Sequence, residues 1–159
     1  MKTDKPKFVY VTIIQTTPKK LWAALINPRF TQQFGMRMES DWKVGSRMEF
    51  RWQGEVSDEG VVLKSQPPKL LVYSFHHLLD KDHRKSMSAE GFSRVTFQIE
   101  PMSKASGLRG PVVRLTVTHD GFPPNSKLHG QVSQGWPTIL SSLKTLLETG
   151  QPLPLTWKN

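Results

Sequence analysis

Apolar residues follow two different spacings along the chain, and the switches between them predict its elements. Phe8 to Ile14 is dense in β-branched and aromatic residues, which is typical of a strand. Thr17 and Pro18 suit the cap and the first position of a helix that ends at residues 27–28. The second proline of this stretch, Pro28, then opens a shorter helix that we expect to run through residue 34.

The middle of the chain alternates apolar and polar residues with a period of two, which predicts antiparallel strands. We expect strands over residues 47–52, 55–64, 70–76, 93–100 and 112–119. Each carries its apolar residues on one side, so one face of the sheet packs on a core and the other meets solvent. Gly60 predicts a break or a bulge nearby in the second of these strands. Residues 35–46 and 101–111 are predicted loops, and the polar residues 78–88 a hairpin tip.

Helical spacing returns near the end of the chain, where apolar residues recur in steps of three and four from Leu128 to Leu147. Pro137 lacks a backbone donor, so we expect the helix to kink there or to divide after Trp136. Gly150 predicts its end. A long helix on one face of a curved sheet buries both apolar surfaces. The prediction is a single α+β domain over residues 1–159, with its core at about 8–150, a basic N-terminal tail and a Pro-rich C-terminal tail.

Charge narrows the function classes. The 159 residues carry 22 Lys and Arg against 13 Asp and Glu, so the formal net charge is 22 − 13 = +9. These charges form no basic helix face, and no zinc-finger spacing or aromatic–basic RNA-binding pattern is present, so we do not expect nucleic acid as the main partner.

The chain has no cysteine, which excludes disulfides and thiolate metal sites. No stretch reaches the ~20 apolar residues of a membrane span. The N-terminus lacks a secretion signal. We expect a cytoplasmic protein.

Several ordered motifs give the chain a family resemblance. They are residues 17–28 (TPKKLWAALINP), 41–46 (DWKVGS), 60–62 (GVV) with Pro67, Pro68 and Leu71, 116–122 with HDG at 119–121, and 135–140 (GWPTIL) with Leu143 and 147–150 (LETG). This set resembles the family of the activator of heat-shock-protein-90 ATPase (AHSA type). That family is part of the superfamily of START domains and birch-pollen-allergen-like proteins.

The resemblance implies a helix-grip fold: a curved antiparallel sheet around a long C-terminal helix, with two short helices after the first strand. It implies an apolar cavity between sheet and helix, which related proteins use for lipids, polyketides or hormones. It also implies that true co-chaperones carry an additional domain. Because no such domain fits before residue 8, we do not expect a co-chaperone role.

Large aromatic side chains fall on the predicted inner face of the sheet and on the facing helix. We expect the ligand cavity to be lined by Phe50, Trp52, Tyr73, Phe75, Phe97, His119, Trp136 and Leu140. The hydroxyl of Tyr73 and the indole N–H of Trp52 or Trp136 are the polar groups that would orient a ligand. The alternative is that these rings are simple core.

Two groups of residues that contain histidine are candidates for proton transfer, ligand binding or metal binding. His119 ends the inner-face series of its strand, so its ring would either orient a ligand oxygen, transfer protons or serve only the structure. The cluster His76, His77, Asp80, Asp82 and His83 has metal-binding residue types, but a polar hairpin tip accumulates the same types for solvation. We expect no catalytic residue, no metal and no cofactor.

The leading interpretation is a protein that binds a small apolar or aromatic molecule in an internal cavity. The first alternative is an enzyme of the cyclase/aromatase kind that uses the same cavity, with His119 or Tyr73 handling protons. The second is a chaperone-related protein-interaction module. Sequence leaves the ligand, the oligomeric state and the pathway open.

Overall fold

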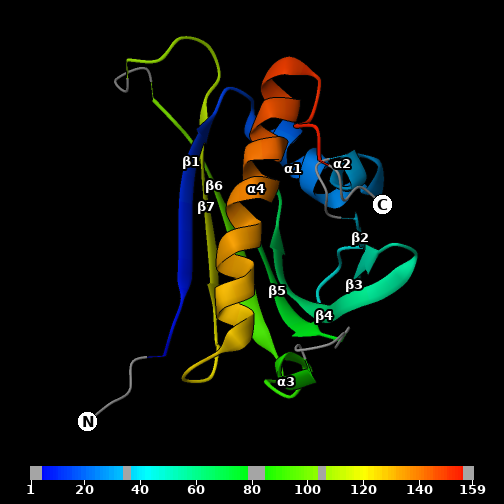
Figure 1. Ribbon diagram of the computed structural model, residues 1–159. Helices are drawn as coiled ribbons and strands as arrows, with labels where there is room; N and C mark the ends of the chain where they lie inside the picture. The colour runs from blue at the N-terminus through cyan, green and yellow to red at the C-terminus, as the bar shows by residue number, and fades with distance from the viewer. Residues whose placement is uncertain (1–4, 34–36, 79–84, 104–106, 156–159) are drawn as a thin grey trace.

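The computed structural model describes residues 5–33, 37–78, 85–103 and 107–155 (Figure 1). Strands and helices follow in the order β1 (Phe8–Ile14), α1 (Pro18–Ile26), α2 (Pro28–Gln33), β2 (Arg37–Glu39), β3 (Arg47–Trp52), β4 (Glu55–Gln66), β5 (Leu70–His77), α3 (Lys85–Ser88), β6 (Ser93–Pro101), β7 (Val113–Asp120) and α4 (Lys127–Thr149). No helix in these ranges combines the length and apolar character that a membrane span needs.

The seven strands form one sheet in the order β1-β7-β6-β5-β4-β3-β2, and every neighbouring pair is antiparallel. β3 to β7 make the continuous meander that the alternating pattern predicts. Helix α4 lies across the concave face, closest to β1, and β3 and β4 form the opposite end of the curved sheet (Figure 1). The helix-grip α+β fold is therefore confirmed, and its core lies between the sheet and α4.

One local prediction was wrong: the expected loop 35–46 contains the short strand β2. A strand of three residues is too short to show an alternating pattern, and tertiary contacts hold it in place. Residues 78–88 connect the antiparallel strands β5 and β6, as expected of a hairpin tip, and end in the one-turn helix α3. Helix α4 is continuous from Lys127 to Thr149, so of the two outcomes expected at Pro137, division does not occur.

The helix ends follow their sequence signals. The Thr17 side chain accepts a hydrogen bond from the Lys20 amide at 3.2 Å, as an N-cap does. Gly150 ends α4 with φ 84°, a left-handed conformation that glycine adopts without a Cβ clash. At the start of α4, the Glu90 carboxylate accepts from the Lys127 amide at 3.0 Å and from the Ser126 hydroxyl. This ties the segment after α3 to the positive end of the helix dipole.

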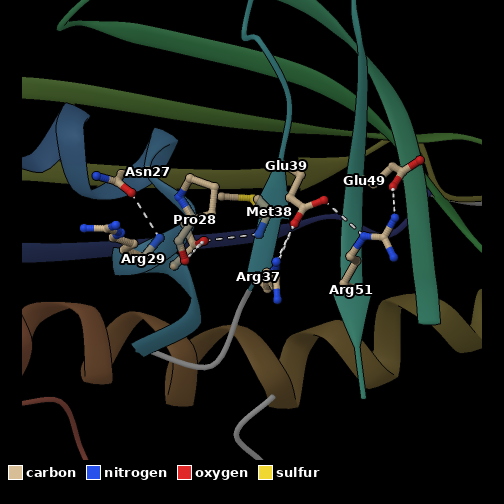
Figure 2. A network of polar contacts seen from close by, with 9 residues as sticks. Asn27, Pro28, Arg29, Arg37, Met38, Glu39, Glu49 and Arg51 are labelled. Carbon is tan, nitrogen blue, oxygen red and sulfur yellow. Dashed lines mark hydrogen bonds and ion pairs between the residues drawn. The ribbon is translucent and has the colours of Figure 1, made fainter. Parts of the chain in front are cut away.

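A ladder of alternating charges runs across the neighbouring strands β2, β3 and β4. Its N–O distances run from 2.8 to 3.2 Å, and Figure 2 shows the part on β2 and β3. The members are Arg37, Glu39, Arg51, Glu49, Arg47 and Glu59. These pairs are partly exposed, so each contributes at most about 1 kcal/mol. All three arginines of the ladder are paired with glutamate carboxylates.

Strand β4 approaches β5 very closely at Gly60. A Cβ built on Gly60 would lie 1.6 Å from the carbonyl oxygen of Ser74, so only glycine fits. The Val61 amide donates to the Ser74 hydroxyl at 2.9 Å instead of joining the backbone ladder. The break or bulge expected near Gly60 is confirmed: Gly60 and Val61 have no register partner on β5, and the register shifts between Val62 and Lys64. The close approach lets β3 and β4 wrap toward the helix side.

We predict that Gly60→Ala lowers the free energy of unfolding by about 3 kcal/mol, because the added methyl group overpacks against backbone. Gly130→Ala is the matched control: it lies within α4 with no atom near its Cβ. There alanine should raise stability by about 1 kcal/mol through helix propensity. Urea unfolding followed by circular dichroism measures both. Equal effects of the two substitutions would contradict the close approach at Gly60.

Candidate ligand site on the inner face of the sheet

The inner face of the sheet carries a continuous aromatic cluster. Neighbouring ring centroids lie 5.1–6.0 Å apart, mostly with edge-to-face or tilted planes. The cluster runs from β3 across the sheet to α4 through Phe50, Phe75, Tyr73, Phe97, His119 and Trp136. Its rings bury large apolar areas and prefer these tilted arrangements over flat stacking.

Seven of the eight residues expected at the ligand site are buried, with exposed fractions of 7% or less. The exception is Trp52, which is only partly buried at the end of β3. The structure thus brings Tyr73 and the phenylalanines together with Trp136 and Leu140, on opposite sides of one core. Trp52 lies at the margin of this group, beyond the irregular register between Phe50 and Arg51.

A chain of buried hydrogen bonds joins α4 to three strands through His119. The Trp136 indole Nε1–H donates to His119 Nδ1 at 3.1 Å, and His119 Nε2 lies 2.7 Å from Ser93 Oγ. Ser93 Oγ in turn donates to the Phe75 carbonyl oxygen at 3.3 Å. Because Nδ1 must accept, a neutral ring carries its proton on Nε2 and donates it to Ser93. Every polar group in this series of hydrogen bonds then has a partner, and the direction of each hydrogen bond is fixed.

Burial makes this histidine a poor base. Removal from water lowers the pKa of His119 to about 3; nearby Asp120 raises it and His129 lowers it by smaller amounts. His119 is therefore neutral at pH 7, and its single lone pair on nitrogen is used by Trp136. The Ser93 hydroxyl accepts a hydrogen bond from the ring rather than donating one to it, so the pair does not have the donor–acceptor order of a serine nucleophile and its base.

Sequence reasoning missed Ser93 as the partner of His119. The alternation that places Val95 and Phe97 inside extends one step back to Ser93, so its burial was predictable. Its pairing was not. Phe75 faces Ser93 and Val95 faces His119 across the β5–β6 and β6–β7 ladders. These registers depend on contacts between distant segments that no local pattern fixes.

The Tyr73 hydroxyl has a weaker partner than any other polar group of the cluster. Tyr73 is fully buried, and its hydroxyl donates to the thioether sulfur of Met38 at 3.9 Å. Burial, and to a smaller extent Asp58, raise the pKa of Tyr73 well above its ordinary value, so the phenol stays protonated. A thioether is only a weak acceptor. Tyr73 therefore holds a donor that a carbonyl oxygen would satisfy better.

A second buried polar group, on β4 and β5, contains His77, Asp58 and Ser57. His77 Nδ1 is 2.8 Å from Asp58 Oδ1, and the Ser57 hydroxyl donates to Asp58 Oδ2 at 2.7 Å. His76 points to the opposite face, where its Nε2 lies 2.9 Å from the Ser88 carbonyl oxygen. The two histidines of the suggested metal cluster thus diverge. Its other members, at 80, 82 and 83, lie outside the described residues, and no metal-binding group of three occurs within them.

The low pKa of His119 predicts acid sensitivity. In the unfolded chain the ring takes up a proton near pH 6.5, whereas the folded ring does so only near pH 3. Between these values the unfolded state binds the extra proton, so stability falls as the pH drops from about 6.5 toward 3.

We predict that wild-type stability falls more steeply in this range than that of His119→Gln, by up to about 1.4 kcal/mol per pH unit. Urea unfolding at several pH values measures the difference, in which carboxylates common to both proteins cancel. Nitrogen-15 spectra should show the His119 proton on Nε2 at pH 5. Parallel stability–pH profiles of the two proteins, or a charged His119 ring at pH 5, would contradict the proposed hydrogen bonding of this histidine.

The family model described as Activator of Hsp90 ATPase homolog 1-like protein matches residues 15–148. A search of curated proteins finds no match.

Solved structures share the fold. The protein MLL2253 from Mesorhizobium loti is 28% identical with a TM-score of 0.73, over 89% of this chain and 96% of that one. The Aha1 dimer from Colwellia psychrerythraea is 20% identical with a TM-score of 0.68, over 91% and 98%. DynU16, from the dynemicin biosynthetic locus, is 17% identical with a TM-score of 0.70, over 96% of this chain and 51% of that one. The last two likenesses concern the fold alone.

The family model spans most of the sequence, and the motifs, the sheet order and the long closing helix agree with it. The chain therefore belongs to the family of Activator of Hsp90 ATPase homolog 1-like proteins.

Proposed function

We propose that this protein binds a small apolar or aromatic molecule between the inner face of its sheet and α4. The binding surface consists of the residues that sequence reasoning selected: Phe50, Trp52, Tyr73, Phe75, Phe97, His119, Trp136 and Leu140. Aromatic and aliphatic side chains with few polar groups are the usual lining of such sites. A ligand placed there gains roughly 25 cal/mol for each Å² of apolar surface removed from water.

The observation that carries the proposal is the Tyr73 hydroxyl. The Tyr73 ring lies between Phe50 and Phe97 in the apolar cluster, and within the described residues its hydroxyl donates only to the sulfur of Met38. A buried donor with so weak an acceptor forgoes part of the roughly 1 kcal/mol that a good hydrogen bond contributes. A ligand oxygen replacing the sulfur would recover it. The favoured ligand is therefore an aromatic molecule with one carbonyl or similar acceptor.

The other polar groups of the cluster support binding over catalysis. Trp136 and Ser93 occupy both ring nitrogens of His119, and its pKa near 3 leaves it neutral. An acid–base residue works best with a pKa near the ambient pH. His119 then acts as a positioning residue that fixes the Trp136 ring over the site. The cyclase-like alternative loses one of its two proton carriers.

The fold likeness to DynU16, from a biosynthetic locus, fits small-molecule handling, whereas the family description and the Aha1 likeness fit a chaperone-related module. The chaperone-related hypothesis requires a surface that contacts a partner protein. Within the described residues, the charge ladder of β2 to β4 pairs its arginines with glutamates. Small-molecule binding is the better supported function because a particular buried group points to it.

We predict that the protein binds 2-acetylnaphthalene more tightly than 2-ethylnaphthalene, by about fivefold, because one hydrogen bond near 1 kcal/mol separates them. Tryptophan fluorescence and thermal shift measure both affinities. Tyr73→Phe should remove the preference and keep the binding of the ethyl compound. Tyr10→Phe is the matched control, since Tyr10 is the other tyrosine and lies on β1.

Two results would count against this function. If neither compound, nor a wider panel of flavonoids and fatty acids, binds up to its solubility limit, the interior is a core and no more. If the acetyl compound keeps its preference in Tyr73→Phe, the hydroxyl is not the polar anchor.

A further inference from the structure

Strand β1 forms one edge of the sheet. It pairs with β7 on one side, and no strand follows it on the other (Figure 1). An edge strand presents unpaired backbone groups to which another chain can add. The use of this edge is independent of the ligand site, which lies on the inner face.

Side chains of α4 cover both ends of the β1 edge. Lys144 Nζ donates to the Ile13 carbonyl oxygen at 2.7 Å, and the Gln15 amide donates to Glu148 Oε2 at 2.9 Å. At the other end, His129 Nε2 lies 3.0 Å from the Lys7 carbonyl oxygen. The capped backbone groups all belong to odd-numbered residues.

Between these caps lies an uncovered window. Backbone groups in an antiparallel strand alternate between the neighbouring strand and the open side, so Val9 and Val11 belong to the same outward series. Neither has a hydrogen bond across the open edge within the described part of the chain. Their side chains are 49% and 54% exposed. Strand β1 contains no charge and no proline, the usual protections of an edge.

The opposite edge of the sheet is protected. Strand β2 has only three residues, two of them charged, and the buried Thr31 hydroxyl of α2 accepts from the Met38 amide at 3.2 Å. Among the described residues, a chain adding to this sheet therefore has one accessible window, at Val9 to Val11.

We propose that this window pairs with the same window of a second copy, antiparallel about Tyr10. The sequence Val9-Tyr10-Val11 reads the same in both directions, so valine faces valine across the symmetry axis. Because Val9 and the partner's Val11 both direct their backbone groups outward, each facing pair exchanges both hydrogen bonds. No charged side chain faces another within the window. This symmetry favours a second copy over an unrelated strand.

The caps and the protected β2 edge limit the assembly. Pairing cannot extend past the residues that α4 covers, and once the two β1 edges meet, no second window remains. The product is therefore a closed, two-fold dimer and not a fibre. The contact is small and the net charge of +9 on each copy opposes it, so the dimer is weak and strengthens with salt.

The test is a concentration series of the full chain at low and high salt, by sedimentation equilibrium and by amide spectra. We expect monomer near 10 µM and at least about half of the chains in dimers near 1 mM, as for an association of about 4–5 kcal/mol. The amides of Val9 and Val11 should shift and gain protection from hydrogen exchange as the dimer forms, whereas the amide of Val61 should not.

Variants separate the edge from other contacts. Val9→Pro removes an outward amide without removing a bond to β7, and Val11→Lys adds charge; both should abolish the dimer. Val61→Lys is the matched control on β4, where the valine is 38% exposed, and should dimerise like the wild type. If Val9→Pro fails to fold, the wild-type amide shifts decide. A monomer at 1 mM, a dimer with unprotected Val9 and Val11 amides, or one that survives in folded Val9→Pro would overturn the proposal. So would an acidic peptide that occupies this edge while the chain stays monomeric.

Discussion

The hydrogen-bond chain from Trp136 through His119 and Ser93 to the Phe75 carbonyl is the constraint on which the interior depends. A buried polar group without a partner costs about 1–3 kcal/mol, so each member requires the next to stay in place. The chain sets how far α4 is rotated on the sheet, since only one rotation brings the Trp136 indole to His119. The same bonds leave the histidine neutral and without a spare lone pair. The same hydrogen bonds therefore fix both the position of α4 and the protonation state of His119.

The curvature of the sheet determines what this helix faces. Because Gly60 lets β4 approach Ser74 closely, β3 can turn inward and bring Phe50 against Tyr73 and Phe75. The resulting concave face meets α4 with rings on both sides. Among the polar groups of this face, those at the β7 end are paired with one another, whereas Tyr73 has only a thioether. The proposed function depends on this asymmetry.

Sequence patterns predict much of the fold, because each meander strand alternates and each long helix carries its caps. They also select seven buried residues of the candidate site, since face and periodicity decide burial. They do not predict which buried groups touch. The bond between Tyr73 and Met38 joins β5 to β2, a strand too short to show a pattern. The pair of Asp58 and His77 likewise depends on register between strands. Local periodicity indicates which side a residue faces but not its partner.

The most direct test of a ligand-binding interior is native mass spectrometry of the protein freshly purified from cells. The account predicts a second species, heavier by the mass of a small molecule, that loses this mass on gentle activation. The added mass should be absent or reduced in Tyr73→Phe and retained in Tyr10→Phe. A single ligand-free species in every preparation, including protein incubated with aromatic carbonyl compounds, would contradict the account and leave the interior as a packed core.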